Sequence, residues 1–370
     1  MSRTRERAAA LQAGPQDALF INGRFLTQPL SGVQRFATEI TAALQRRHPD
    51  RVVVLGPPGV EQAGLPGTRA VGRRRGQAWE QLDLPAPARR GVLINLGNTA
   101  PLRGGPQVVV IHDAGVFATP EAYSWQFRAW YKFAHKRLAR GRSRIVTVSE
   151  FARGEICRYL GANRDEIAVI SEGADHMHAI EAEPAILRTL PPGRFVLVVG
   201  NLAAHKNLAA LSRLAQALAE RRVSLVITGG LAMGAFRQAS LRSLPQPACY
   251  LGRVSDGELK ALYQAAACLV FPSRYEGFGL PAIEAMAAGC PVAVSRVPAL
   301  REACGEAALY FDPASPDDIA REVGRLLDDD ALEQRLRRAT LQQAQRFTWA
   351  RAAGQLAAIA DGMRSHGASV

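Results

Sequence analysis

The chain has 370 residues, of which 48% are hydrophobic, so it can hold two domains with well-filled cores. Its formal net charge is +13, and residues 1–150 carry almost all of it, with 22 Lys and Arg against 10 Asp and Glu. No apolar run approaches the roughly 18 residues of a membrane-spanning helix, and residues 1–18 lack the apolar core of a secretory signal. We therefore expect a disordered arm at residues 1–18 of a cytoplasmic protein.

The first predicted strand, Ala18–Ile21, leads through a loop to a helix that begins at Gly32. The apolar residues after Gly32 recur at helical spacing, so the loop glycine meets a helix N-terminus with free amides. Such a turn can bind an anion at Gly32 and Val33, and an ordinary turn between strand and helix is the alternative.

His112 follows a predicted strand at Val108–Ile111. A side chain at the carboxyl end of a parallel strand faces the crevice above the sheet, where ligands bind. The alternative is a histidine that is hydrogen-bonded to a loop carbonyl. A metal pair with Asp113 is disfavoured, because no third ligand is suggested nearby.

Residues 124–144 form a predicted helix without a single acidic residue. At helical spacing one side collects apolar residues and the other collects basic ones, namely Phe127, Tyr131, Ala134 and Leu138 against Arg128, Lys132, Lys136 and Arg140. A surface helix packed on the sheet and weak contact with an anionic membrane surface, on the inner face of the plasma membrane, remain equal alternatives. Nucleic acid is not an expected partner, since no binding module is recognised.

The second half opens with an unbroken apolar strand at Phe195–Val199, followed by Gly200 and, near the start of a predicted helix, Lys206. Further strands are predicted at Val223–Ile227 and Tyr250–Val254, and Ser255 is expected to cap the next helix. A solvated lysine is the alternative to a phosphate-binding Lys206.

The five cysteines are scattered and form no Cys-x-x-Cys pair, so we expect structural thiols. The run Asp328–Asp330 could be mistaken for a metal-binding motif. Because it lies between two predicted helices, we interpret it as an N-cap cluster. No metal or other cofactor is expected.

The most informative stretch is LVFPSRYEGFGLPAIEAMAAGCPVAV, residues 269–294. It predicts a strand, a glycine-bearing loop, a short helix that begins near Pro281, and a second strand. Gly277 and Gly279 allow backbone to approach a ligand, and the helix N-terminus favours an anion. With Glu276 in the loop and Glu284 on the helix, the unit suits a ligand that is phosphate at one end and rich in hydroxyls elsewhere. A nucleotide sugar is such a ligand.

This stretch resembles the Glu-x7-Glu signature of retaining glycosyltransferases of family 4, which have the GT-B fold. The resemblance covers nearly the whole chain from about Ile21. It implies Glu276, His112 and Lys206 as catalytic residues. It also implies donor binding by Gly32, Val33, Asn201, Lys206, Arg253, Val254, Gly277, Phe278, Gly279, Leu280 and Glu284. The chain departs from the family pattern at Asn201 and His205, where arginine is frequent, and at Glu172, where asparagine is expected.

We therefore predict an α/β protein of two doubly wound Rossmann-like domains that face each other across a cleft. The expected divisions are an acceptor-side domain at 19–180, a hinge at 181–193, a nucleotide-sugar-binding domain at 194–350, and a helix at 351–370 that crosses back to the first domain. The predicted function is metal-independent transfer of a sugar to a glycan or polyprenyl-diphosphate-linked acceptor in bacterial surface polysaccharide synthesis. GDP-mannose is the preferred donor. A UDP-sugar transferase and a non-catalytic nucleotide-sugar-binding or scaffold protein are the alternatives.

Overall fold

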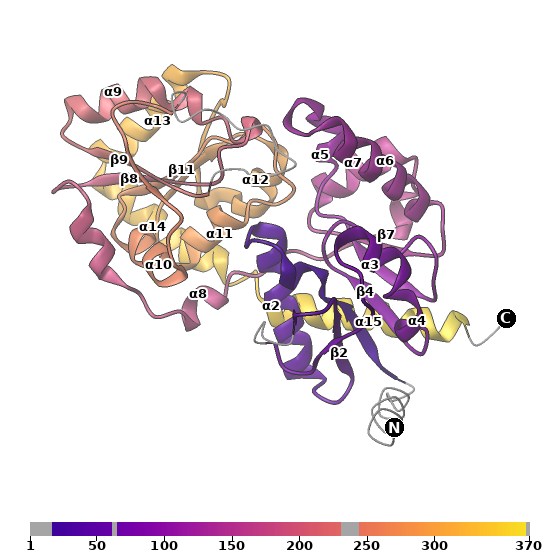
Figure 1. The fold of residues 1–370 in the computed structure, drawn as a ribbon. Coiled ribbons are helices and arrows are strands. Elements are labelled where there is room, and N and C mark those ends of the chain that lie inside the picture. The colour runs from indigo at the N-terminus through magenta and orange to yellow at the C-terminus, as the bar shows by residue number, and fades with distance from the viewer. Residues whose placement is uncertain (1–16, 61–64, 231–243, 368–370) are drawn as a thin grey trace.

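Two parallel β-sheets, each covered by helices on both faces, make up the protein (Figure 1). The computed structural model describes residues 17–60, 65–230 and 244–367, and the described side chains end at Arg364. Residues 1–16 of the predicted N-terminal arm lie outside the described residues, whereas Ala18 is buried at the start of the first strand. The predicted fold class, two doubly wound domains, is confirmed.

The first sheet has seven parallel strands in the order β3-β2-β1-β4-β5-β6-β7. Their bounds are β1 Leu19–Asn22, β2 Val52–Gly56, β3 Thr68–Ala70, β4 Val92–Asn95, β5 Gln107–Val110, β6 Arg144–Thr147 and β7 Ile167–Val169. The inner strands are buried along their whole length because helices cover both faces, which explains their unbroken apolar sequence. The strand order reverses at β1 and β4, and this reversal marks the crevice of the sheet.

The second sheet repeats this plan with six parallel strands in the order β10-β9-β8-β11-β12-β13. Their bounds are β8 Phe195–Val199, β9 Ser224–Thr228, β10 Cys249–Gly252, β11 Cys268–Phe271, β12 Val292–Ser295 and β13 Leu309–Phe311. Here the order reverses at β8 and β11. The loops that carry Lys206 and Glu276 therefore leave from the two strands that border the crevice.

The α-helices are α2 Gly32–Arg47, α3 Gly76–Leu82, α4 Pro85–Ala88, α5 Gly115–Ala118, α6 Trp125–Ala139, α7 Glu150–Leu160, α8 His176–Ala179, α9 Ser212–Glu220, α10 Asp256–Ala265, α11 Leu280–Ala287, α12 Pro298–Cys304, α13 Pro316–Asp328, α14 Asp330–Ala344 and α15 Trp349–Gly367. The 3₁₀ turns are η1 Gly23–Thr27, η3 Pro120–Ala122, η4 Arg164–Glu166, η5 Pro184–Thr189, η6 Ala204–Lys206, η7 Leu208–Leu211 and η9 Gly305–Ala307. Among the described residues, no helix is long and apolar enough to cross a bilayer.

Several helix ends follow the predicted local chemistry. Ser255 and Glu258 form a reciprocal capping box at α10. Asp329 accepts from the amide of Leu332 and caps α14, which confirms the capping interpretation of the acidic run. Gly289 follows α11 with a φ of 77°, the left-handed conformation that glycine adopts most readily.

The helix predicted to begin near Lys206 starts later than expected. Two short 3₁₀ turns, η6 and η7, occupy this region, and α9 begins at Ser212. Between the turns, Asn207 has a φ of 60° and donates through Nδ2 to the carbonyls of Pro272 and Pro313. These tertiary hydrogen bonds hold a left-handed residue that a continuous helix excludes.

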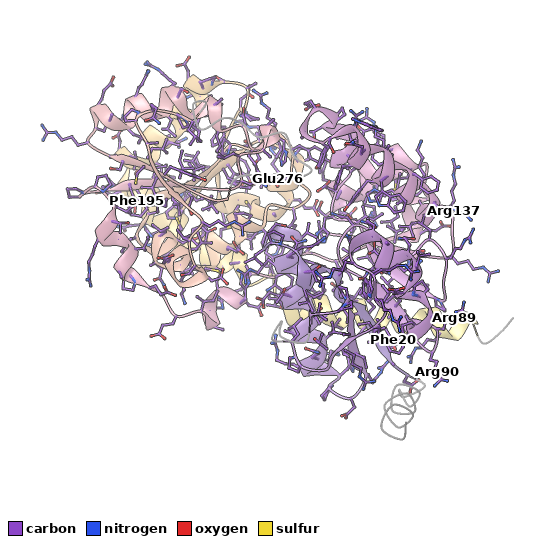
Figure 2. The ribbon with its side chains drawn as sticks, in the orientation of Figure 1. Phe20, Arg89, Arg90, Arg137, Phe195 and Glu276 are labelled. Carbon is purple, nitrogen blue, oxygen red and sulfur yellow. The ribbon has the colours of Figure 1, made fainter. Side chains whose placement is uncertain are left out.

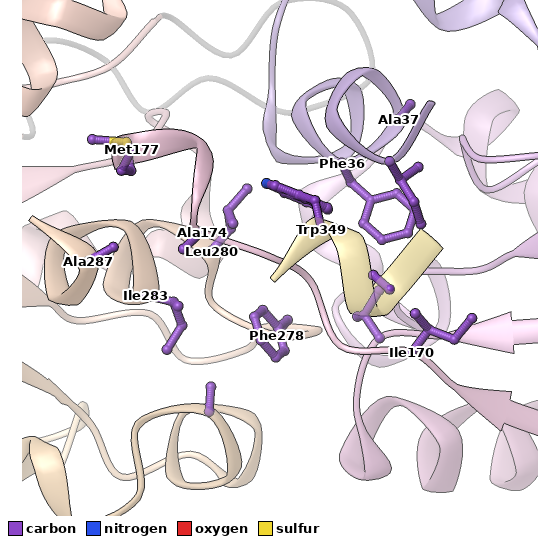
Figure 3. Packing of buried hydrophobic residues seen from close by; sticks show 14 of the residues in the cluster. Phe36, Ala37, Ile170, Ala174, Met177, Phe278, Leu280, Ile283, Ala287 and Trp349 are labelled. Carbon is purple, nitrogen blue, oxygen red and sulfur yellow. The ribbon is translucent and has the colours of Figure 1, made fainter. Parts of the chain in front are cut away.

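The last helix, α15, returns from the second sheet to the first and packs against α2 (Figure 1). Where it begins, the side chain of Trp349 lies beside Phe36 of α2, with ring centroids 5.7 Å apart (Figure 3). The amide of Ala174 donates to the carbonyl of Phe347 at 3.1 Å, so the two chain segments that connect the sheets are joined here. One buried apolar cluster consequently runs through residues of both sheets.

The helix α6 differs from its predicted two-sided pattern. Its buried face includes Ala134 and Leu138 as expected, but Lys132 lies over the ring of Phe117, with Nζ 5.2 Å from the ring centroid. The most exposed apolar side chains of this helix are Trp125, 73% exposed, and Phe133, 56% exposed. The solvent face therefore combines two aromatic side chains with the exposed basic residues of the last turns, whereas Arg128 and Lys132 are half-buried.

Candidate active site

Lys206 and Glu276 meet at the carboxyl edge of the second sheet. Lys206 Nζ donates to Glu276 Oε1 at 2.7 Å and lies 5.1 Å from the centroid of the Phe271 ring. Their side chains are 15% and 12% exposed, so the pair is enclosed and still reachable from solvent. Figure 2 shows Glu276 on the side of the second sheet that faces the first. The fold thus places one cation and one carboxylate together at the crevice.

The loop that carries Glu276 runs into the N-terminus of α11. Pro281 has no N–H group, and the amide of Ala282 already donates to the carbonyl of Gly279 at 2.9 Å. Neither Pro281 nor Ala282 therefore offers an amide to an anion. The amides of Gly279 and Leu280, at the positive end of the helix dipole, are those positioned for a phosphate.

Gly277 allows the two domains to lie close together, because it has no Cβ atom. A Cβ atom built on Gly277 would lie 2.4 Å from the carbonyl oxygen of His112 and 3.1 Å from Cβ of Asp113. This glycine thus allows close approach to backbone of the other domain, and its approach to a ligand stays a prediction. Ser149 Oγ also donates to the carbonyl of Gly277 at 2.6 Å. The loop that carries Glu276 is therefore docked against the first domain.

Both ring nitrogens of His112 have partners. Nε2 is 3.0 Å from the carbonyl oxygen of Leu96, and Nδ1 is 3.3 Å from Oε1 of Glu172. Burial raises the pKa of Glu172, although its hydrogen bond with His112 opposes this shift. Because a carbonyl oxygen can only accept, Nε2 carries a proton and donates to Leu96. The histidine is thus held by its own domain, as the carbonyl-bonded alternative states, and presents its backbone carbonyl to Gly277.

The predicted donor-binding segments of the two domains come together at the N-terminus of α2. Arg253 Nη2 is 3.4 Å from the carbonyl of Leu30, two residues before Gly32. Arg35 of α2 forms an ion pair with Asp256 of α10 close by. Val254 packs against the shared apolar cluster, and Val33 is half-buried. These contacts bring Gly32 and Val33 within reach of Arg253.

Other predicted donor residues point elsewhere. Phe278 is 3% exposed and packs edge-on against Phe347, and Leu280 is 5% exposed, so only their backbone is available to a ligand. Asn201 accepts from the amide of Ala203 at 3.3 Å within its own turn. Burial lowers the pKa of His205, and the neighbouring charge of Lys206 lowers it further. A neutral His205 leaves Lys206 as the cation of this loop.

Glu284 lies at a separate point, buried between α8, α10 and α15. His176 Nε2 is 3.1 Å from Glu284 Oε1, and the hydroxyl of Tyr263 is 3.5 Å from Oε2. Trp349 Nε1 donates to His176 Nδ1 at 3.0 Å. The sequence analysis missed His176 and Trp349 as partners of Glu284, because nothing in their spacing, 108 and 65 positions from Glu284, points to a contact.

A further contact between the domains, made by Glu302, was not predicted from the sequence. The carboxylate of Glu302 on α12 accepts from the amides of Glu150 and Phe151 at the N-terminus of α7, at 2.8 and 3.1 Å. The amide of Ala114 donates to the hydroxyl of Tyr275 at 3.2 Å. The residues of the central motif are therefore fixed by the opposite domain at Tyr275 and Gly277, on both sides of Glu276.

Chemically, this arrangement suits a ligand with a strongly anionic part. Lys206 and the amides before Pro281 can stabilise developing negative charge, and Glu276 can stabilise developing positive charge beside it. Within the ranges that the structure describes, no group of three His, Cys, Asp or Glu side chains is arranged to hold a metal ion.

Comparison with known proteins agrees with this geometry. Residues 30–178 match the description Glycosyltransferase Family 4, and residues 180–343 match Glycosyl transferases group 1. The fold is also similar to that of the Anabaena protein HepE in complex with UDP-glucose, with a TM-score of 0.71, 18% identity and coverage of 94% of this chain and 99% of that one. Two Rossmann-like domains that face each other are the GT-B architecture. The chain belongs to the group 1 glycosyltransferases, with a family 4 N-terminal domain.

Two curated relatives are bacterial enzymes of O-antigen assembly. The chain is 33% identical over 262 residues to O-antigen chain mannosyltransferase B of Escherichia coli, which covers 65% of this chain and 66% of that protein. It is 28% identical over 233 residues to O-antigen chain mannosyltransferase RfbU of Salmonella typhimurium, covering 60% and 63% respectively. The matched region is thus less than two thirds of each relative.

Proposed function

We propose that this protein is a retaining, metal-independent mannosyltransferase that uses GDP-mannose and a hydroxyl of a glycan or lipid-linked glycan acceptor. The observation that carries the proposal is the Lys206–Glu276 pair, 2.7 Å apart beside the N-terminus of α11. The names of the two O-antigen mannosyltransferases support the sugar and the pathway. In the absence of donor, each member of the pair neutralises the other.

The reaction breaks the bond between the anomeric carbon and the diphosphate oxygen, the acceptor oxygen bonds to that carbon on the same face of the sugar, and the hydroxyl proton of the acceptor passes to the departing diphosphate. In this proposal the diphosphate draws Lys206 away from Glu276, and Lys206 with the amides of Gly279 and Leu280 stabilises the leaving charge. Glu276, once released, stabilises the positive charge that develops on the sugar. Because these groups are already positioned, they contribute mainly in the transition state.

Thermal unfolding against a panel of nucleotide sugars tests the donor. A donor at 100 times its Kd should add about 2.7 kcal/mol to the free energy of unfolding. GDP-mannose should give the largest shift and UDP-glucose a smaller one. A larger shift with a UDP-sugar would replace the mannosyl proposal with the UDP-sugar alternative.

Turnover distinguishes an enzyme from a non-catalytic binding or scaffold protein. Incubation with the donor and an acceptor glycan should release GDP, and excess EDTA should leave the rate unchanged. Proton NMR of the product should show the anomeric configuration of the donor. Binding without turnover would support the scaffold alternative, and a rate restored only by Mn²⁺ or Mg²⁺ would contradict metal independence.

We also propose weak contact between α6 and an anionic membrane surface, because its solvent face pairs Trp125 and Phe133 with basic side chains. Arg137, labelled in Figure 2, lies on the outer side of the first domain, away from Glu276. Trp125→Ser with Phe133→Ser should reduce binding to vesicles that contain phosphatidylglycerol. Leu341→Ser, on an exposed leucine of α14, is the matched control. Equal vesicle binding by all three proteins would exclude α6 as the contact.

A further inference from the structure

We infer that His176 is a positioning residue that holds Glu284 for the donor nucleotide, through a hydrogen-bonded chain from Trp349 to His176 to Glu284. The inference rests on the proposed function, in which Glu284 binds the ribose hydroxyls of the donor. The inference adds His176 and Trp349 to the nucleotide site and places a proton on Nε2 of His176.

The hydrogen-bond geometry determines the tautomer of His176. An indole N–H can only donate, so the 3.0 Å contact from Trp349 Nε1 requires His176 Nδ1 to be an acceptor without a proton. The proton of the neutral ring must then lie on Nε2, which is 3.1 Å from Glu284 Oε1. His176 therefore donates to Glu284, and the carboxylate keeps its second oxygen, Oε2, on the side of Tyr263.

Burial keeps this chain in one arrangement. His176 is 8% exposed, Glu284 is 7% exposed and Trp349 is 1% exposed. Trp349 is held by the ring of Phe36 and by its own amide, which donates to Oδ1 of Asp175 at 2.8 Å (Figure 3). A neutral imidazole between an indole and a carboxylate cannot rotate without leaving buried polar groups unpaired, which is costly.

The chain also connects Glu284 to the point where the polypeptide crosses between domains. His176 follows the first crossing and Trp349 follows the second, and a Cβ atom on Gly173 would lie 2.5 Å from the amide nitrogen of Trp349. A change in the angle between the domains must move these two segments. Because His176 contacts both Trp349 and Glu284, such a movement reaches the carboxylate directly.

The test replaces the indole donor and measures the pH dependence of nucleotide binding. In Trp349→Phe the ring packing is kept, but Nδ1 of His176 loses the N–H donor that excludes a proton from this nitrogen, so the nitrogen becomes open to a proton as the pH falls. The imidazolium then forms an ion pair with Glu284, and the hydrogen bonds of the Glu284 carboxylate to ribose become weaker. The other charged or titratable groups that face this site are Glu284, Tyr263, Arg35, Glu172 and Asp175, and all are unchanged in the variant.

Calorimetry with GDP, and with UDP in parallel, provides the binding constants from pH 8 to pH 5.5. The ratio of the Kd of Trp349→Phe to that of the wild type removes the titration of the nucleotide itself. This ratio should rise about threefold to tenfold as the pH falls. Trp79→Phe is the matched control, because Trp79 is equally buried and donates through Nε1 to the carbonyl of Val71 at 2.7 Å in the first domain. Its ratio should stay near one.

Nitrogen-15 NMR of the imidazole rings provides a measurement that does not depend on nucleotide binding. The His176 signals, identified by their loss in His176→Gln, should show a proton on Nε2 in the wild type throughout this pH range. A proton on Nδ1, or a constant Kd ratio for Trp349→Phe, would overturn the inference while leaving the proposed function in place. If neither GDP nor UDP binds the wild type, the proposed function falls and the role of His176 falls with it.

Discussion

The two sheets share one strand order around their crevices, yet they use the crevices differently. In the first domain β1 and β4 end in Asn22 and Asn95, and Asn22 Nδ2 donates to Asn95 at 2.9 Å and to Glu80 at 2.7 Å. Glu80 also pairs with Arg24 and is 1% exposed. In the second domain β8 and β11 end in Val199 and Phe271, and the nearest charges, Lys206 and Glu276, keep 15% and 12% exposure.

The difference indicates that the crevice of a doubly wound sheet can bind a ligand only where its polar side chains remain accessible to that ligand. In the first domain the polar groups satisfy one another, so the network acts as a core. In the second domain the Lys206–Glu276 pair can exchange partners with a phosphate and a sugar. Each substitution below breaks or sharpens this contrast.

Glu276→Gln should have the largest effect. The amide cannot stabilise positive charge on the sugar, so kcat should fall by about 10²–10³-fold, while the Kd for GDP stays within a few-fold of the wild type. Steady-state kinetics and calorimetry on the same preparation separate the two quantities. Normal turnover would remove Glu276 from the catalytic assignment.

Glu80→Gln should produce the opposite pattern. Loss of the carboxylate leaves Arg24 as a buried cation without its partner, which should lower the free energy of unfolding by about 3 kcal/mol. Thermal and urea unfolding measure this loss. The kcat of the folded variant should equal that of the wild type, and a strong fall in kcat without loss of stability would show that the first crevice also binds substrate.

Lys206→Ala should weaken transition-state stabilisation by about 2 kcal/mol and so lower kcat/KM roughly 30-fold, because one charge-assisted hydrogen bond to the diphosphate is lost. Lys260→Ala is a suitable control, since Lys260 donates to the backbone carbonyl of Ile180 and not to Glu276. If kcat/KM is unchanged in Lys206→Ala, another group holds the phosphates.

Glu284→Gln should have the smallest effect on the reaction. Ribose hydroxyls do not change charge during transfer, so the variant should weaken GDP binding by about 1 kcal/mol and leave kcat nearly unchanged. Competition between GDP and the donor, measured beside kcat, checks this. A fall in kcat comparable with that of Glu276→Gln would mean that the two glutamates do not have separate roles.

The local sequence was sufficient for most of the predicted elements, the helix near Lys206 excepted, and for the position of the central motif. The strand Phe195–Val199 has the predicted bounds, and the cap at Ser255 forms as expected. Strand burial, helix periodicity and caps depend on neighbours a few residues away, so they are readable without a fold.

Tertiary structure alone decided the partners of the site residues. Lys206 and Glu276 are 70 positions apart, and Trp349 and His176 are 173 positions apart. The role of Gly277 depended on where the carbonyl of His112 lies in the other domain. The Lys206–Glu276 contact follows from the pairing of β8 with β11 in the second sheet, whereas the other two contacts follow from how the two sheets are docked by α15 and the crossing segments. No periodicity or local spacing records that docking, because it is set by packing between residues far apart in the chain.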